Sequence, residues 1–214
     1  MPDRFPGYDV LAKRHTPSWN AITRRVIDER LALPRDPRFF NEQEFQTLTA
    51  VCARIVPQPT TRAPIPLAAM VDDKLFRNRT DGYRRAGLPR QREAWKRGLH
   101  ALDEEARSRC GARFHRLGAE EQDALLKQMQ QGELTNSAWG DMPCKLFFSE
   151  RLARDIASAY YAHPTAWNEI GFGGPASPRG YVRMQENRRD PWEAAEAAPG
   201  ENPALVRHRN RHVA

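Results

Sequence analysis

Apolar residues recur along most of this chain with the three- to four-residue spacing of an α-helix, and no segment of any length alternates as a β-strand does. The pattern is clearest after residue 41, where Phe45, Leu48 and Cys52 fall on one stripe. Asn41 is a suitable N-cap, and Glu44, three residues later, completes a capping box. This segment is therefore predicted to be a core helix in an all-α fold.

The same spacing predicts further helices at residues 19 to about 33, 67–77, 91 to about 116, 119–131 and about 148–163. In the last of these, Arg151 and Asp155 lie largely off the apolar stripe. Pro164 ends this helix because the residue before a proline is pushed out of the α region. His163 is expected at its C-terminal end, where a positive ring suits the helix dipole. The apolar residues of the first helix lie near one face: Trp19, Ile22, Val26 and Leu33.

An extended arm is predicted at residues 1–17, which contain three prolines and one glycine. Phe5, Tyr8 and Leu11 make this arm too apolar for an idle tail. Such an arm either packs across its own domain or reaches onto a partner, and the sequence leaves both open.

After Pro164 comes a turn with Trp167, followed by a loop that contains four glycines. A loop so rich in glycine, proline and aromatic residues either plugs a core or docks on another molecule. Residues 185–214 are polar and nearly without periodicity, so they are predicted to form a mostly disordered tail. The expected organisation is thus an irregular multi-helix domain at residues 18–184 between an arm and a tail.

The charge balance is basic, with 34 Lys and Arg against 27 Asp and Glu and a net charge of +7. The excess reflects either a solvated surface or an acidic partner, since arginine pairs well with carboxylate and phosphate alike. Residues 77–92 are the most basic segment but hold a single tyrosine, which is more typical of a solvated or protein-docking face than of a nucleic-acid site. A basic nucleic-acid-binding or regulatory protein is therefore the alternative function, and nucleic acid is not the favoured partner.

Catalytic and metal-binding patterns are not found in the sequence. Cys52, Cys110 and Cys144 are far apart and form no CxxC pair, so no zinc site is predicted; at most one disulfide is expected, with its pairing left open. The GFGGP loop lacks the flanking strand and helix of a dinucleotide fingerprint. We predict no catalytic, cofactor-binding or metal-binding residue in this chain, a profile that fits an accessory subunit better than an enzyme.

The sequence also bears on localisation. No apolar run approaches the roughly 20 residues that a membrane-spanning helix needs, so no membrane insertion is expected. No signal peptide is predicted, and Arg24 and Arg25 are not followed by the apolar region of a twin-arginine signal. The expected location is the cytoplasm, or the periplasm if a signal-bearing partner carries the chain there.

Several segments in a fixed order carry a family resemblance: FNEQEF, LTAVCARIVPQP, FHRLGAEEQDALL, KLFF and AYYAHPTAWNEIGFGGPASPRGY. Over roughly residues 7–184, the chain resembles the gluconate 2-dehydrogenase subunit 3 family. The motifs are distinctive in combination, although none of them is a catalytic signature.

The resemblance implies a non-catalytic small subunit that accompanies a large flavoprotein dehydrogenase of the glucose-methanol-choline type. The large subunit would carry FAD and act on a sugar, a sugar acid or an alcohol, and a cytochrome c subunit is a further candidate partner. The small subunit would stabilise the large one, help it mature or accompany its export. No twin-arginine leader of the kind that some family members carry is predicted in this sequence.

A stable complex of this kind would bury apolar and aromatic anchors at its interface. Eight residues from the arm, the first helix and the glycine loop are our predicted partner-binding residues: Phe5, Tyr8, Leu11, Trp19, Trp167, Phe172, Pro175 and Tyr181. Residues 77–92 are a candidate polar rim. Packing inside the chain's own core is the competing interpretation for Trp167 and Phe172.

Overall fold

The computed structural model describes residues 3–82, 85–175, 180 and 192–212, and these form helices and loops without any strand. The prediction of an all-α fold is confirmed. The chain divides into two compact units: a terminal unit of Met1–Ala32 and Tyr161–Ala214, and a central unit of Leu33–Tyr160. No helix among the described residues is both long and apolar enough to cross a membrane.

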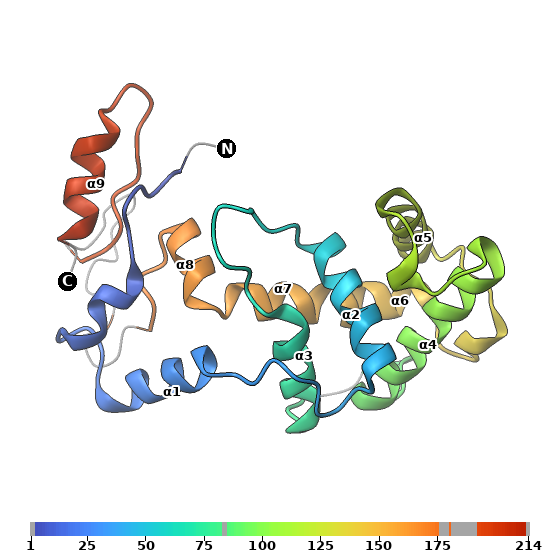
Figure 1. The fold of residues 1–214 in the computed structure, drawn as a ribbon. Coiled ribbons are helices and arrows are strands. Elements are labelled where there is room, and N and C mark those ends of the chain that lie inside the picture. Colours follow the sequence, from blue (N-terminus) through green and yellow to red (C-terminus); the bar gives the residue numbers. More distant parts are fainter. Residues whose placement is uncertain (1–2, 83–84, 176–179, 181–191, 213–214) are drawn as a thin grey trace. The chain divides into compact units, whose positions relative to one another are not determined.

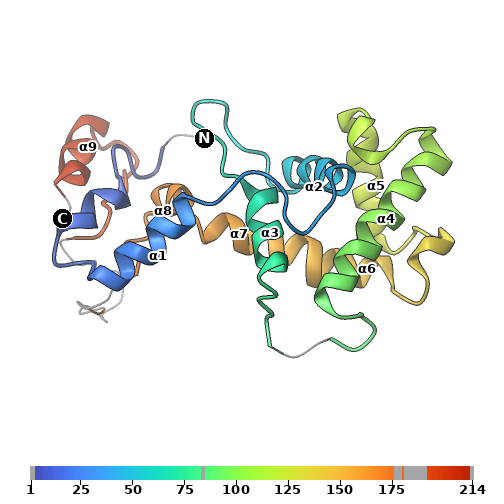
Figure 2. The ribbon, with the colours of Figure 1, turned by 60° about the horizontal axis from the view of Figure 1, so that its bottom comes forward.

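The central unit is built from helices that follow one another along the chain (Figures 1 and 2). They are α2 (Glu42–Ile55), α3 (Leu67–Phe76), α4 (Gln91–Cys110), α5 (Ala119–Gln131), α6 (Cys144–Phe147), the π-helical turn η4 (Phe148–Ala153) and α7 (Arg154–Tyr161). Two short 3₁₀ turns connect them, η2 (Phe114–Arg116) and η3 (Ser137–Trp139).

The start of α2 has the predicted capping box. The Asn41 side chain accepts a hydrogen bond from the backbone N–H of Glu44, and the Glu44 carboxylate accepts one from the Asn41 N–H, both at 2.9 Å. These two bonds satisfy amides that have no partner within the helix. Leu48 and Cys52 are buried on the inner face, as predicted.

Trp95 of α4 is the centre of the apolar core of the central unit. Its ring is fully buried and meets Phe40 and Phe147 edge to face, with ring centroids 6.3 and 5.6 Å apart. Gly98 lies beneath Phe147, and a Cβ at that position would be 2.2 Å from the ring. Close packing therefore explains a glycine inside a helix of 20 residues, where its conformational freedom is unfavourable.

Helix α4 is shorter than the segment predicted from the sequence. It ends at Cys110, because Gly111 adopts a left-handed conformation with φ of 75°. The apolar pattern continues into η2, where Phe114 is buried, but this turn is a separate element. Gly111 is thus the C-terminal boundary of the helix.

Buried carboxylates hold the connecting segments of the central unit in place. Asp72 of α3 accepts hydrogen bonds from the backbone N–H groups of Arg38, Phe39 and Phe40, at 2.8 to 3.0 Å. Glu105 of α4 accepts from the N–H of Asn136 at 2.7 Å. Each carboxylate satisfies backbone amides that would otherwise be buried without a partner.

The terminal unit joins the two ends of the chain around a core of its own. Its elements are the 3₁₀ turn η1 (Val10–His15), α1 (Ala21–Leu31), α8 (Pro164–Ile170) and α9 (Pro203–Arg211). The buried cluster consists of Phe5, Tyr8, Val10, Trp19, Ile27, Trp167 and Ala194, with Leu11 and Trp192 partly buried against it. The N-terminal arm thus packs within its own unit.

Helix α1 differs from its predicted start and orientation. It begins at Ala21, and the side chain of Asn20 caps it by accepting from the N–H of Thr23 at 2.8 Å. Ile27 is its buried apolar residue, whereas Ile22 and Val26 are 64% and 44% exposed. The prediction that these two residues lie on one helix face with Trp19 is wrong, because Trp19 precedes the helix and is buried.

The segment around Pro164 also differs from its prediction. Helix α7 ends at Tyr161, and Pro164 occupies the first position of α8, where its missing N–H costs nothing. His163 is the N-cap of α8, and its Nδ1 accepts from the N–H of Thr165 at 3.2 Å. His163 therefore serves a helix N-terminus, and its predicted place at a C-terminal end is wrong.

Part of the predicted tail is helical. Residues 185–191 lie outside the described residues, but α9 forms further on, with Asn210 almost fully buried. Asn210 accepts from the N–H of Ala195 at 2.7 Å and donates to the carbonyl oxygen of Pro6 at 3.1 Å. The predicted disorder thus does not extend to residues 203–211, because contacts with the arm stabilise a segment whose own pattern is weak.

Candidate functional site

Four of the eight predicted partner-binding residues belong to the buried cluster of the terminal unit. Phe5, Tyr8, Trp19 and Trp167 are only 2% to 6% exposed. The Trp167 Nε1 donates to the carbonyl oxygen of Tyr161 at 2.6 Å. In this conformation these side chains support the surface of the unit from within and do not form it.

The other four residues lie nearer the surface or outside the described part of the chain. Leu11 and Pro175 are half-buried, and Tyr181 lies outside the described residues. Phe172 is 37% exposed, and its ring meets Trp167 edge to face at 5.5 Å. Phe172 is therefore the predicted residue that the structure places best for contact with another molecule.

The glycine loop packs onto the core of its own unit. Gly171 has φ of 67°, and a Cβ there would lie 2.4 Å from the ring of Phe5. Gly174 has φ of 74°, and a Cβ there would lie 3.2 Å from Trp19. Gly171 and Gly174 thus pack against the core of their own unit, because each allows an aromatic ring to approach the backbone.

Tyr8 links the arm to this loop. Its hydroxyl donates to the carbonyl oxygen of Phe172 at 3.4 Å. Burial, with smaller contributions from the charges of Glu193 and Asp9, raises the pKa of Tyr8 well above its ordinary value. The hydroxyl therefore stays protonated and remains a donor across the physiological range.

Two exposed apolar side chains flank Gly171 at the end of α8. Ile170 is 47% exposed and Phe172 is 37% exposed, and we call them the α8 apolar pair. Outside this pair, the terminal unit also exposes large apolar side chains at 41% to 64%: Ile22, Val26, Leu31, Tyr161 and Leu205. The α8 apolar pair is the first candidate functional surface, because Trp167 holds Phe172 from beneath.

All three cysteines are free, which resolves the open question about a disulfide. Cys52 and Cys144 are buried, whereas Cys110 is exposed at the end of α4. Burial raises the pKa of the Cys52 thiol well above its ordinary value, so it remains a neutral apolar group.

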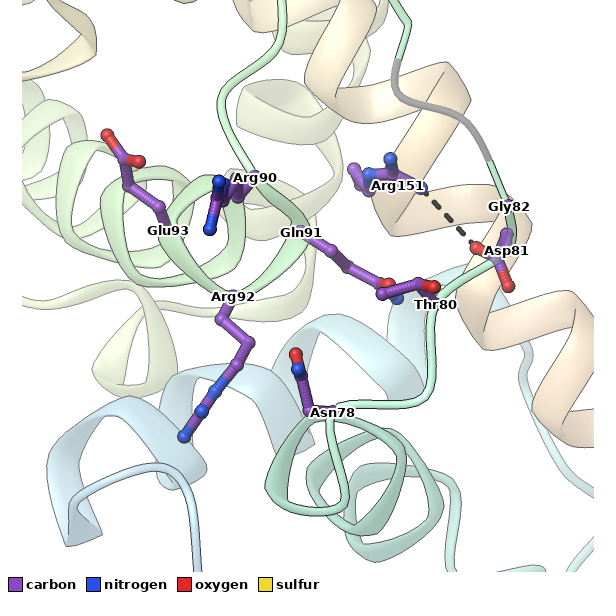
Figure 3. A pocket seen from close by; sticks show the side chains of 9 residues that line it. All are labelled: Asn78, Thr80, Asp81, Gly82, Arg90, Gln91, Arg92, Glu93 and Arg151. Carbon is purple, nitrogen blue, oxygen red and sulfur yellow. Dashed lines mark hydrogen bonds and ion pairs between the residues drawn. The ribbon is translucent and has the colours of Figure 1, made fainter.

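The second candidate site is a polar pocket of about 500 Å³ in the central unit (Figure 3). Its walls come from the loop after α3, the first turn of α4 and the π-helical turn η4. The lining residues are Asn78, Thr80, Asp81, Gly82, Arg90, Gln91, Arg92, Glu93 and Arg151. We call this the η4 pocket.

A chain of alternating charges connects the core to this pocket. Asp155 is 2% exposed and accepts from the Trp95 Nε1 at 2.8 Å and from the Lys74 Nζ at 2.9 Å. Lys74 also donates to Asp81 at 2.7 Å, and the other Asp81 oxygen lies 3.4 Å from an Arg151 Nη, as the dashed line in Figure 3 marks. Each buried charge thus has an opposite neighbour, which burial requires.

The sequence pattern missed this group because it placed Arg151 and Asp155 off the apolar stripe of their helix. Both are buried, with 6% and 2% exposed. Arg151 lies within a turn of π-helix and Asp155 comes two residues after it; such turns are rare and concentrated at functional sites. A helical pattern predicts that a polar residue is exposed, because it contains no information about what covers that face. Here the loop that contains Asp81, 70 residues earlier in the chain, lies against Arg151.

The basic segment at residues 77–92 is partly neutralised by ion pairs. Arg77 lies 2.8 Å from Asp73, and Arg85 lies 3.1 Å from Glu150. The guanidinium of Arg92 lies 4.8 Å from the centre of the Phe39 ring. The segment therefore joins the fold of the central unit, and its C-terminal end forms one wall of the η4 pocket.

One family of known proteins matches this chain. The model of gluconate 2-dehydrogenase subunit 3 matches residues 42–174, which include every helix from α2 to α8 and the α8 apolar pair. The arm and α1, which also carried the resemblance in sequence, lie outside the match. Neither the curated proteins nor the solved structures contain a match to this chain.

Proposed function

Because the chain belongs to the gluconate 2-dehydrogenase subunit 3 family, we propose that it is the non-catalytic small subunit of an FAD-dependent dehydrogenase complex. The observation that carries the proposal is the family match over residues 42–174. The large subunit, of the glucose-methanol-choline type, holds FAD and acts on a sugar, a sugar acid or an alcohol. This chain binds the large subunit and stabilises it.

The exposed apolar residues support a docking role for the end of α8. Ile170 and Phe172 lie inside the family match and expose 47% and 37% of their surface. The backbone N–H of Phe172 donates to the carbonyl oxygen of Trp167 at 2.9 Å, which fixes the residue in place. Preorganised apolar anchors lose little conformational entropy when a partner covers them.

The alternative function, binding of nucleic acid, has only the basic charge in its favour. Arg77 and Arg85 are already paired with carboxylates, so the segment at residues 77–92 presents less free charge than its composition suggests. We therefore keep residues 77–92 as a candidate for the polar rim of the interface with the protein partner.

The proposal is tested by co-expression of the tagged chain with a large flavoprotein subunit of the glucose-methanol-choline type from the same source. We expect a stoichiometric complex whose visible spectrum shows bound flavin. A colourless monomer in the presence of abundant flavoprotein would contradict the proposal.

Two substitutions test whether the α8 apolar pair is the docking surface. Ile170→Asp and Phe172→Asp are each expected to reduce the retained flavin by about tenfold or more, because a buried interface charge is costly. Leu205→Asp is the matched control, since Leu205 is an exposed apolar residue of the same unit outside the family match. An equal loss with the Leu205 variant would place the docking surface elsewhere.

A further inference from the structure

Two histidines at the C-terminal end of α9 form a pair that docking at α8 does not use. His208 lies in the last turn of the helix and His212 is its C-cap, and both side chains are exposed. Their ring centroids are 4.5 Å apart, with the ring planes tilted by 49°. The sequence predicts no metal ligand here, because a disordered tail would not hold the two rings together, whereas the observed helix does.

The spacing of the pair is that of a helical metal chelate. Residues four apart lie on the same face of an α-helix, and two histidines at this spacing hold zinc in helical metal sites. A metal bonded to two imidazole nitrogens at about 2.0–2.1 Å keeps the ring centres roughly 4.5–5.5 Å apart. The observed 4.5 Å falls in this range, so rotation of two exposed side chains, without movement of the backbone, brings both nitrogens to one ion.

A hydrogen bond fixes the proton of His212. Its Nδ1 lies 2.7 Å from the carbonyl oxygen of His208. A carbonyl oxygen can only accept, so Nδ1 is the donor, and Nε2 of the neutral ring keeps its lone pair. A metal-binding histidine typically donates its other ring N–H in this way, which orients the ring and makes it a stronger ligand. His212 thus has the tautomer that a metal requires at Nε2.

The end of the helix itself favours a cation. The last carbonyl groups of a helix have no partner within it, and they carry the partial negative charge of the helix dipole. His208 and His212 lie beside these groups in α9. A metal ion held by the pair would thus be stabilised by the helix as well as by its two ligands.

The basic residues of α9 do not block the site. Arg209 is paired with Glu201. The side chain of Arg207 packs against Gly7 of the arm, where an added Cβ would lie 2.6 Å from its Cγ. Arg211 remains next to the pair as an opposing charge, and it lowers the affinity for a cation without removing a ligand.

We propose that His208 and His212 bind one divalent late transition metal ion, with Cu²⁺ preferred over Ni²⁺ and Zn²⁺. Imidazole suits these metals, and Cu²⁺ binds nitrogen ligands most tightly among them. Among the residues that the structure describes, no third histidine, cysteine or carboxylate joins the pair, so water completes the coordination. This inference does not depend on the dehydrogenase partner.

Metal binding would also stabilise α9 against the arm. Asn210 lies between the two ligands; it donates to the carbonyl oxygen of Pro6 and accepts from the N–H of Ala195. The chelate exists only while residues 208–212 are helical, so the ion binds the folded end of the chain in preference to its unfolded form. The contact between the two ends of the chain is therefore more stable with metal than without it.

Isothermal titration calorimetry of the full-length chain without a histidine tag tests the binding. The Cys110→Ser variant serves as the background, because an exposed thiol would itself bind or reduce copper. The probes are Cu²⁺, Ni²⁺ and Mg²⁺, added as chlorides. We expect one tight equivalent of Cu²⁺, weaker binding of Ni²⁺ and no binding of Mg²⁺, which prefers oxygen ligands. The absence of a copper site at about 100 µM metal, or an equal affinity for Mg²⁺, would overturn the proposal.

Single substitutions locate the copper site. His208→Ala and His212→Ala are each expected to weaken copper binding by about tenfold or more, because a second ligand on the same scaffold acts at a high effective concentration. His100→Ala is the matched control, since His100 is an exposed histidine outside the pair. Unchanged affinity in either pair variant, or equal weakening by the His100 variant, would overturn the site.

A spacing variant tests the chelate itself. His208→Ala combined with Arg211→His keeps two histidines, but at adjacent positions of the helix, which do not face each other. The combination also removes the opposing charge of Arg211, so it favours a metal in every respect except spacing. We expect an affinity close to that of His208→Ala alone. An affinity equal to that of the unsubstituted pair would show that the two rings do not act as a chelate and would overturn the proposal.

Hydrogen exchange measures the effect of the metal on α9. At a copper concentration ten times the dissociation constant, opening of the helix is expected to become about tenfold rarer. The slower exchange should extend over residues 203–212 and to the N–H of Ala195, which Asn210 holds, and it should be absent in His212→Ala. Unchanged exchange at saturating copper would overturn the stabilising role of the metal.

Discussion

The two units of this protein are built over very different distances along the chain. In the terminal unit, the backbone N–H of Val10 donates to Asn168, and Asn210 donates to Pro6, across 158 and 204 residues. In the central unit, Asp72 accepts from Phe40 across 32 residues, and its longer contacts, such as that of Lys74 with Asp155, span 81 residues. Since closing a long loop costs more chain entropy than closing a short one, the terminal unit forms only when nearly the whole chain is available.

The units also differ in what stabilises them. The terminal unit depends on an aromatic cluster that includes Trp19 and Trp167. Glycines of the neighbouring loop allow aromatic rings to pack directly against the backbone. The central unit adds buried carboxylates to its apolar core, among them Asp155 and Asp72. Added volume is therefore expected to destabilise either unit at a glycine packed against a ring, whereas the loss of a buried carboxylate is expected to destabilise the central unit.

The largest expected effect is the loss of a buried charge in the central unit. Asp155→Ala leaves Lys74 and Trp95 without their shared acceptor and is expected to lower the free energy of unfolding by about 3–5 kcal/mol. Hydrogen exchange resolved along the chain measures the effect, which should be confined to peptides of residues 33–160.

Asp155→Asn is the control for that substitution, because it keeps an oxygen acceptor and loses only the charge. A smaller loss of stability is expected from it. If hydrogen exchange rose equally in peptides of residues 3–32 and 192–212, the two units would unfold together and would not be stabilised separately.

The next effect concerns added volume in the terminal unit. In Gly171→Ala the new Cβ meets the Phe5 ring at 2.4 Å in a left-handed backbone conformation. We expect a loss of about 2–4 kcal/mol, from backbone strain and overpacking together, measured by urea unfolding.

Gly200→Ala separates these two causes within the same unit. Gly200 also has a positive φ, of 81°, but a Cβ there would contact nothing within 4 Å. Its loss should be about 1–2 kcal/mol, the cost of the backbone conformation alone. Equal losses at the two glycines would show that Phe5 does not pack tightly on the loop.

The smallest effect is a difference in reactivity that leaves stability unchanged. All three cysteines belong to the central unit, and Cys110 is the exposed one. We expect one thiol to react rapidly with a thiol reagent in the native protein, while Cys52 and Cys144 react only when the central unit opens. Cys110→Ser should remove the rapid phase, and a rapid phase that persists would mean that a buried thiol is accessible.

Local features of the fold were predictable because they depend on neighbouring residues. The capping box of Asn41 and Glu44 appears as predicted, and so does the helix at residues 119–131. The order of short motifs also identified the family, which the match over residues 42–174 confirms. Of the candidate surfaces, the sequence supplied Phe172 but not the residues of the η4 pocket.

What the sequence determined by itself is the all-α class, the positions of most helices and the family. The helix period and the caps are properties of consecutive residues, so they can be read without knowing what lies opposite. Only the tertiary structure decided that Phe5 and Trp19 are inside, that Ile22 is outside, and that Arg151 and Asp155 are buried. Burial depends on which distant segment covers a helix face, and the packing of the whole chain determines which segment that is.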